Sequence, residues 1–326
     1  MKLKVALLAG GNSSEREIAL KSAAMVEAAF DRAKYDVMTV DVCGRDWTFT
    51  DPYGKKWLLD RNDFSVTENG RKTVFDYAFV MIHGTPGEDG KIQGYLDMMG
   101  VPYSSSGLVS TVTTFDKQLT KRTVRGIEGL NLAREVVLRK GDIVDPAEIT
   151  GKLGLPVFVK PNASGSSFGV SKVKRVEDMR AAVEAAFAES DTVLIEEFVE
   201  GREFGCGIAV TGGGEYVLPV AEIISKNEFF DYEAKYTEGR SDEIVPADIP
   251  AELSQRLQRI ASAVYKVCGC RGVARADFIV TAHGDIYMIE INSIPGMSPG
   301  SIVPKQILAA GMTMTEFLDI IIEDTR

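Results

Sequence analysis

The sequence predicts an α/β protein in which an open, mostly parallel sheet is followed by two α+β lobes. Near the start of the chain, apolar strands alternate with an amphipathic helix, which is typical of a parallel sheet. In the middle, short strands flank a loop rich in serine and glycine, and a strand-rich stretch with one long helix follows. A chain of 326 residues is long enough for two or three domains.

The first domain is expected over residues 1–115, and its elements follow from apolar periodicity. A short apolar run precedes a glycine turn, and the helix after it carries an apolar stripe. Ser104–Gly107 and a helix to about Lys121 lead out of this domain. The expected elements are the strand Lys4–Ala9, the turn Gly10–Ser14, the helix Glu15–Phe30 and the strands Asp36–Val42 and Tyr77–Ile82.

The two α+β lobes are expected over residues 116–203 and 204–326. The central lobe is predicted to have a helix at Val176–Ala188 and strands at Arg134–Leu138, Leu155–Lys160, Val170–Val173 and Thr192–Phe198. The C-terminal lobe is predicted to have strands at Phe204–Val210 and Tyr216–Ile224, a polar loop at Ser225–Asp242, and helices at Ala251–Val267 and near Met314–Glu323.

The composition is that of an ordinary globular protein, with 45% hydrophobic and 26% charged residues. A net charge of −10 argues against general nucleic-acid binding, which needs a basic field. No segment has the apolar length of a membrane span, and the first apolar run is shorter than a secretory core. We therefore expect a cytoplasmic protein with no membrane partner. Its four scattered cysteines are expected to be buried thiols.

The strongest candidate for a functional site is a predicted hairpin near the end of the chain, with its turn at residues 281–285. Because side chains alternate across a strand, Arg275 and Asp277 share one face, as do Glu290 and Asn292. The hairpin would bring three oxygen ligands beside one guanidinium among apolar neighbours, where unpaired charges are costly. This pattern favours a hard cation, normally Mg²⁺, completed by substrate phosphate. The alternative is an edge hairpin with solvated acids.

Two further segments are candidates for nucleotide contact. Lys160–Gly169 places a lysine at a strand end before a flexible loop, whose amides and hydroxyls can face phosphate oxygens, although it lacks the ending of a P-loop. Val193–Gly201 is an apolar strand that runs into an acidic turn, and its backbone groups can contact an adenine edge. The alternatives are a solvated hairpin turn for the first segment and a charged strand end for the second.

Taken in order, these motifs resemble the ATP-grasp superfamily, in which two α+β lobes clamp ATP, and within it the D-alanine–D-alanine ligases. The resemblance is colinear over nearly the whole chain. Its first motif and the one at Asp231–Tyr236 are specific to the ligases rather than to the superfamily. The segments that carry it are Ala9–Glu17, His83–Gly90, Asp116–Lys117, Lys160–Gly169, Asp231–Tyr236, Arg275–Asp277 and Glu290–Met297.

The resemblance implies an ATP site and a metal site. Lys117 and Lys160 are implied to hold the α- and β-phosphates, and Lys235 to reach the transferred phosphoryl group. Two Mg²⁺ ions are implied, with Mn²⁺ as a substitute and K⁺ as a candidate activator. Their ligands would be Asp277, Glu290 and Asn292. The residues implied to surround adenine and ribose are Glu196, Phe198, Val199 and Glu203.

The resemblance also implies an amino-acid site. Glu15 matches the carboxylate that holds the ammonium group of the first D-alanine, and Ser166 and Tyr236 match its hydrogen-bond partners. Arg275 and the Gly296 amide are implied to stabilise the oxyanion. Ser301 and Ile302 are implied to bind the carboxylate of the second amino acid, and His83 to lie by the first substrate.

The chain departs from the family pattern at two positions. Ser164 stands where the family often has Glu, and Gly300 stands where it often has His. We therefore expect a different charge near the nucleotide and a roomier second-substrate pocket. The loop Ser225–Asp242 is implied to be a lid that keeps water from a labile acylphosphate, and the alternative is an ordinary surface loop.

The implied activity is the ATP-dependent joining of two D-alanines through an acylphosphate, for peptidoglycan precursors. The expected partners are D-alanine, ATP and a second copy of the chain, paired through the first domain, with no nucleic acid. One alternative is a D-alanine–D-lactate ligase, against which Tyr236 argues because such ligases typically lack that hydroxyl. The other is a catalytically silent nucleotide-binding regulator, which would have lost a metal ligand or Arg275.

Overall fold

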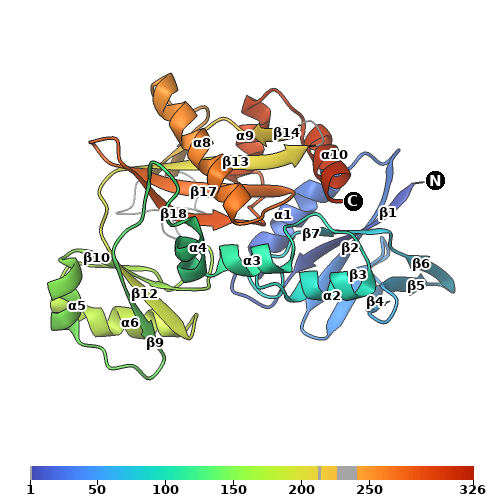
Figure 1. Cartoon of the computed structure of the whole chain (residues 1–326). Helices are drawn as coiled ribbons and strands as arrows, with labels where there is room; N and C mark the ends of the chain where they lie inside the picture. The colour runs from blue at the N-terminus through green and yellow to red at the C-terminus, as the bar shows by residue number, and fades with distance from the viewer. Residues whose placement is uncertain (1, 212–213, 226–240) are drawn as a thin grey trace.

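The computed structural model describes residues 2–211, 214–225 and 241–326. Three β-sheets, each accompanied by helices, organise this part of the chain. In Figure 1 the first sheet lies at the right, the second at the lower left and the third across the top. Within the described ranges, no helix is long and apolar enough to cross a membrane.

The first sheet has seven strands in the order β6-β5-β4-β3-β2-β1-β7. The three strands β2, β1 and β7 are parallel, as the sequence predicts. Four antiparallel strands that the sequence analysis missed extend the sheet on the β2 side, and none has more than two buried residues. The seven strands are β1 (Leu3–Gly10), β2 (Tyr35–Cys43), β3 (Asp46–Thr50), β4 (Lys56–Asp60), β5 (Ser65–Glu68), β6 (Arg71–Val74) and β7 (Tyr77–Val80).

The segment that leads out of the first domain contains two helices where the sequence predicts one. The carboxylate of Asp116 separates them and accepts a hydrogen bond from the Leu119 amide at 2.8 Å, which caps the second helix. Lys117 therefore begins a new helix. The helices up to this point are α1 (Arg16–Ala29), α2 (Lys91–Met99), α3 (Leu108–Phe115) and α4 (Lys117–Val124).

The second sheet is antiparallel and has the order β11-β10-β12-β9. The loop rich in serine and glycine connects its β10 and β11 strands, as predicted. The elements are β9 (Glu135–Arg139), α5 (Pro146–Leu153), β10 (Val157–Pro161), β11 (Ser171–Val173), α6 (Met179–Phe187) and β12 (Thr192–Glu197), with a 3-10 turn at Val176–Asp178.

The third sheet has the order β16-β15-β13-β17-β18-β8, and β14 also pairs with β13. The single strand predicted at Tyr216–Ile224 is two strands, which pair with different parts of β13. Pro219 lies between them and has no N–H to donate to a ladder. The elements are β8 (Leu130–Asn131), β13 (Arg202–Thr211), β14 (Gly214–Val217), β15 (Ala221–Ser225), β16 (Ser241–Ile244), α8 (Ala251–Val267), β17 (Val273–Val280), β18 (Ile286–Asn292), α9 (Ile302–Ala309) and α10 (Met314–Thr325).

The pairing of β17 with β18 confirms the predicted hairpin. Arg275 lies opposite Asn292 and Asp277 lies opposite Glu290, in an antiparallel register with a bulge directly after Asp277. On the other face of β17, Ala276 and Phe278 are fully buried in the core beneath α8. The alternation of side chains therefore presents all four polar groups on one face.

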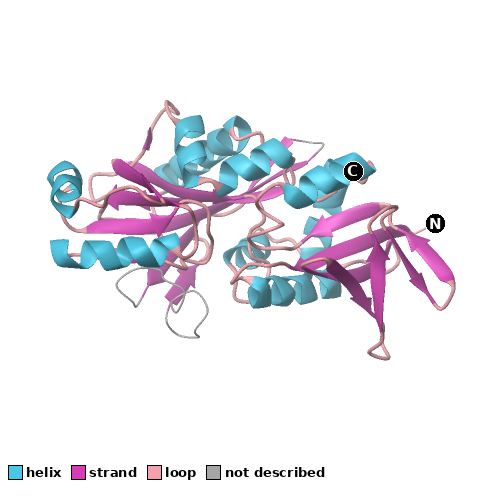
Figure 2. Cartoon of the chain, turned by 90° about the horizontal axis from the view of Figure 1, so that it is seen from below, coloured by secondary structure: helices cyan, strands magenta, loops and turns pink. Residues whose placement is uncertain are grey.

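The last helix of the chain packs both against the first domain and against the third sheet that precedes it in sequence. Phe317 and Ile321 of α10 are fully buried in the same cluster as Leu7 and Leu8 of β1. At the surface, Asp319 accepts hydrogen bonds from Lys34 at 2.5 Å and from the Tyr35 hydroxyl at 2.7 Å. Figure 2 shows the C-terminal helix beside the strands of the first sheet.

This packing predicts a large loss of stability when Phe317 is truncated. Phe317→Ala should lower the free energy of unfolding by about 3–5 kcal/mol, because the ring is fully buried and its removal leaves a cavity. Urea unfolding followed by circular dichroism measures this loss. Leu308→Ala on α9 is the control, since that side chain is 65% exposed and its truncation should cost less than about 0.5 kcal/mol. Equal losses would contradict the packing described here.

Candidate functional site

A cavity lies between the second and third sheets and encloses about 1040 Å³ of space, part of it open to solvent. Strands β10, β12, β17 and β18 and the first residue of α4 contribute to its wall. Many residues predicted for nucleotide, metal or oxyanion contact line it. They are Lys117, Lys160, Glu196, Val199, Glu203, Arg275, Asp277 and Glu290.

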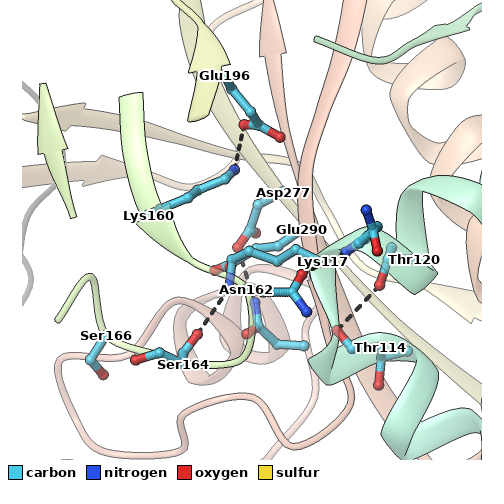
Figure 3. A network of polar contacts seen from close by, with 12 residues as sticks. Thr114, Lys117, Thr120, Lys160, Asn162, Ser164, Ser166, Glu196, Asp277 and Glu290 are labelled. Atoms are coloured by element: carbon cyan, nitrogen blue, oxygen red, sulfur yellow. Dashed lines mark hydrogen bonds and ion pairs between the residues drawn. The ribbon is translucent and has the colours of Figure 1, made fainter. Parts of the chain in front are cut away.

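The predicted metal ligands meet at one side of this cavity. Arg275 donates to both carboxylate oxygens of Asp277, each at 2.7 Å, and the amide nitrogen of Asn292 lies 3.2 Å from the same carboxylate. Glu290 is 3.2 Å from the ammonium of Lys117, and Figure 3 shows these side chains together. Asp277 is only 4% exposed, so its charge depends on these neighbours.

The donor set of this cluster fits Mg²⁺. Two carboxylates and an amide provide hard oxygen ligands on one face of the hairpin. In the parts of the chain that the structure describes, no three His, Cys, Asp or Glu side chains are placed so that they could hold a metal ion by themselves. Mg²⁺ is usually held by one or two carboxylates together with substrate phosphates, so an open arrangement of this kind suits it.

A second charged group lies deeper in the central lobe. The buried carboxylate of Glu196 is 2.5 Å from the ammonium of Lys160 and 2.8 Å from that of Lys121. Burial by itself would raise the pKa of Glu196, but the two lysines outweigh it and hold this pKa below its ordinary value. Figure 3 shows Lys160 and Glu196 pointing toward each other across the sheet.

The loop after β10 is held against the first domain. The Ser166 hydroxyl donates to the carboxylate of Glu15 at 2.5 Å, and the Lys117 ammonium donates to the Ser164 carbonyl at 2.9 Å. A side chain at Gly165 would meet a Glu15 oxygen at 2.4 Å, so only glycine allows this approach. Ser166 and Ser167 adopt positive φ angles of 50° and 60°, which are uncommon for residues with a side chain.

A smaller cavity of about 280 Å³ adjoins the first, and the two share several wall residues. Glu88, which the sequence analysis did not single out, contributes to its wall and accepts a hydrogen bond from the Gly84 amide at 2.7 Å. Burial, and then the nearby Glu15 carboxylate, raises the pKa of Glu88 well above its ordinary value. The shared residues are Lys117, Ser164, Gly165 and Glu290.

His83 is buried close to the Glu15 carboxylate. Its ring nitrogen Nε2 lies 3.3 Å from the Ser22 hydroxyl, and that hydroxyl also accepts the Met297 amide at 3.2 Å. Burial lowers the pKa of His83 in spite of the neighbouring Glu15 carboxylate. Burial thus favours the neutral imidazole, and the Ser22 hydroxyl of α1 links His83 to the segment after β18.

The segment after β18 brings together the residues predicted for the oxyanion and the second amino acid. Gly296 lies so close to Ser301 that an added Cβ would be 2.8 Å from the serine oxygen. Ser301 shares a hydrogen bond of 2.8 Å with Ser298 and stands at the N-cap position of α9, directly before the buried Ile302. An added Cβ at Gly300 would meet no atom within 4 Å, so this position is open.

Three of the predicted residues are placed differently or cannot be placed. Phe198 is not part of the cavity wall. Its ring packs on Phe158, with 6.0 Å between the ring centroids, and Phe158 does line the cavity. Lys235 and Tyr236 lie outside the described residues, as does most of the predicted lid Ser225–Asp242.

Lys121 and Glu135, which were not predicted from the sequence, complete the charged group around Glu196. Lys121 lies 2.6 Å from a Glu135 oxygen and is only 7% exposed. One signal was available, because Lys121 follows Lys117 by one helical turn and therefore lies on the same side of α4. Nothing local in the sequence indicates that its partners come from β9 and β12.

The chain matches two models of known protein families. Residues 4–106 match the family described as D-ala D-ala ligase N-terminus, and residues 127–323 match the family described as D-ala D-ala ligase C-terminus. Together these matches include both the Glu15 segment and the Arg275–Asn292 hairpin.

Relatives and solved structures agree with these matches. Proteins named D-alanine--D-alanine ligase from Phocaeicola vulgatus and Flavobacterium johnsoniae are 44% and 42% identical to the chain, with 99% and 98% of each sequence covered. The VanG D-Ala:D-Ser ligase of Enterococcus faecalis superimposes with a TM-score of 0.86 at 31% identity, covering 99% of both chains. A Bacillus anthracis D-alanine--D-alanine ligase complexed with ATP gives a TM-score of 0.77 at 28% identity, covering 99% of this chain and 96% of that one. The chain therefore belongs to the D-alanine–D-alanine ligase family, whose members are ATP-using enzymes of the ATP-grasp fold.

Proposed function

We propose that this protein joins two D-alanines into D-alanyl-D-alanine for peptidoglycan precursors, converting ATP to ADP and phosphate. The observation that carries the proposal is the contact of Ser166 with Glu15. It places an acceptor for an ammonium group directly beside a cavity lined by two lysines and two carboxylates that suit a metal–phosphate complex. A kinase site would need no binding site for an amino-acid ammonium group next to its phosphates.

The phosphate half of the proposed site uses charge to bind and orient ATP. Lys117 begins α4 at the cavity wall, and Lys160 reaches the same wall from the end of β10. Both ammonium groups can bind phosphate oxygens, and the loop around Ser164–Ser167 can add amides and hydroxyls. Asp277, Glu290 and Asn292 would hold Mg²⁺, or Mn²⁺ in its place. The metal supplies charge neutralisation on the phosphoryl group being transferred.

The amino-acid half of the proposed site fixes the first substrate through its ammonium group. Glu15 is 6% exposed, and the Ser166 hydroxyl fixes one of its oxygens. Its remaining acceptor positions can hold an ammonium, and a buried carboxylate binds such a cation strongly because little water competes. We expect the substrate carboxylate to point from there toward the phosphates and to become the acylphosphate. Tyr236 is proposed to contribute a second hydroxyl that hydrogen-bonds beside Glu15, as Ser166 does.

The second substrate is proposed to bind at the start of α9. Ser301 and Ile302 begin this helix, and unsatisfied amides at a helix N-terminus bind a carboxylate well. The amine of the second D-alanine would then attack the acylphosphate. Arg275 and the Gly296 amide are proposed to stabilise the oxyanion that forms, since fixed donors in a water-poor site stabilise developing charge. The open space at Gly300 leaves this pocket roomy.

Further features of the proposal follow from the chemistry and the family. An acylphosphate hydrolyses readily, so we propose that the loop Ser225–Asp242, with Lys235, closes the site against water.

We also propose that adenine and ribose contact Glu196, Phe198, Val199 and Glu203. We further propose that K⁺ activates the reaction, that the reaction is cytoplasmic, and that the protein is a homodimer paired through the first domain. A silent regulator is not favoured, because Arg275 and the three metal-type ligands are all retained.

The proposed activity can be tested directly with the full chain. Mixing it with ATP, Mg²⁺ and D-alanine should release phosphate and form D-alanyl-D-alanine in equal amounts, and omitting D-alanine should abolish both. Phosphate release and mass spectrometry of the product measure this. D-lactate and D-serine, each competed against D-alanine from pH 6 to 9, should give only minor products. Absence of phosphate release at every pH and K⁺ concentration would overturn the proposal.

The metal-binding face predicts a specific loss of turnover. Asp277→Asn should lower the rate of dipeptide formation by about 100-fold or more, because the metal loses a charged ligand and Arg275 loses its bidentate partner. The control is Asp178→Asn, which removes one charge from an exposed surface pair with Arg175 and should leave the rate unchanged. Equal rates for wild type and Asp277→Asn would instead favour a role outside catalysis.

A further inference from the structure

Lys121 is a buried lysine to which the proposed chemistry gives no role. It is 7% exposed and lies on α4, outside the wall of the large cavity. Its ammonium contacts the Ala133 carbonyl at 2.8 Å, a Glu135 oxygen at 2.6 Å and a Glu196 oxygen at 2.8 Å. The Ala133 carbonyl and Glu196 accept hydrogen bonds from the ammonium, and Glu135 adds an ion pair, so Lys121 is held from three sides.

Glu196 divides its two carboxylate oxygens between two lysines that differ in their access to the cavity. One oxygen faces Lys160, which lines the cavity, and the other faces Lys121, which lies behind it. When phosphate draws Lys160 away, Glu196 keeps a counter-charge only through Lys121. Without that counter-charge a carboxylate that is 9% exposed would be left unpaired, which is strongly unfavourable.

The position of Glu135 explains why one lysine is needed between two acids. Glu135 on β9 is the cross-strand neighbour of Glu196 on β12, and like charges directly opposite each other destabilise a sheet. Lys121 bridges the pair from the helix above. Its contact with Glu196 raises its own pKa against the effect of burial, as does its contact with Glu135.

We propose that Lys121 is a positioning residue for nucleotide binding, which holds the Glu196 carboxylate in place so that Lys160 is free to bind phosphate. Glu196 then remains available to accept a hydrogen bond from the exocyclic amine of adenine. This inference rests on the nucleotide contact proposed above for Glu196 and Lys160. Lys121 itself touches neither the nucleotide nor the reacting atoms, so its effect is on binding and base preference.

The test measures binding of ADP and IDP to the full chain by isothermal titration calorimetry, with no amino acid present. IDP differs from ADP in carrying a carbonyl where adenine carries the exocyclic amine. Lys121→Met should weaken ADP binding at least tenfold and IDP binding clearly less, because both nucleotides lose the Lys160 contact with phosphate whereas only ADP also loses the contact of its exocyclic amine with Glu196. The preference for ADP therefore falls. Glu135→Gln is the matched control and should leave ADP binding within threefold of wild type, because the Lys121–Glu196 contact remains.

The double variant Lys121→Met, Glu135→Gln separates a positioning role from a purely structural one. It removes the second acid that Lys121→Met alone leaves unpaired, so we expect it to fold even if the single variant does not, and circular dichroism checks this. We expect its ADP binding to stay at least tenfold weaker than wild type. Recovery of ADP binding in the double variant, or equal losses for ADP and IDP, would overturn the inference. Failure of the ligase activity alone would not overturn the inference, because the binding measurements contain no D-alanine.

Discussion

The site depends first on the register of one pair of strands. Because Arg275 lies opposite Asn292 and Asp277 opposite Glu290, four polar groups meet on the face of the hairpin that borders the cavity. The other face carries Ala276 and Phe278 into the core, and a shift of one residue would exchange the two faces. Burial of that apolar face therefore fixes the positions of the candidate metal ligands.

Lys117 connects this hairpin to the rest of the molecule. Its ammonium contacts Ser164 on the loop of the central lobe and Glu290 on the third sheet, while Asp116 caps the helix that it begins. Through that loop, Ser166 reaches Glu15 in the first domain. A short chain of polar contacts thus links all three parts of the protein, and the substrates of the proposed reaction would lie along it.

The sequence predicted those features that have a local signature. The hairpin was predictable because polar and apolar residues alternate over 274–278 and 289–292, and the β1–α1–β2 order because its apolar periods are clear. Strands β3–β6 were missed because they are only four or five residues long and none has more than two buried residues to mark an apolar period. The division of α3 from α4 depends on a single capping residue, Asp116.

The roles of Glu88 and Lys121 could not be predicted in this way. The pKa of Glu88 is raised in part by the nearby Glu15. Lys121 contacts Glu196, which is 75 residues away in the sequence. Such contacts arise only when separate elements pack together, and no period or spacing within one segment records them. Membership of the family indicates the reaction type, whereas these buried charges become visible only in three dimensions.

The packing of α10 on the first sheet also bears on how the protein is made. Synthesis proceeds from the N-terminus, and the apolar cluster around β1 stays incomplete until residues 314–325 have been added. At typical translation rates, the ribosome needs on the order of 10–45 s to pass from the end of the first domain to that helix. During this interval part of the apolar surface of the first domain is uncovered, so its folding is completed only after α10 has left the ribosome.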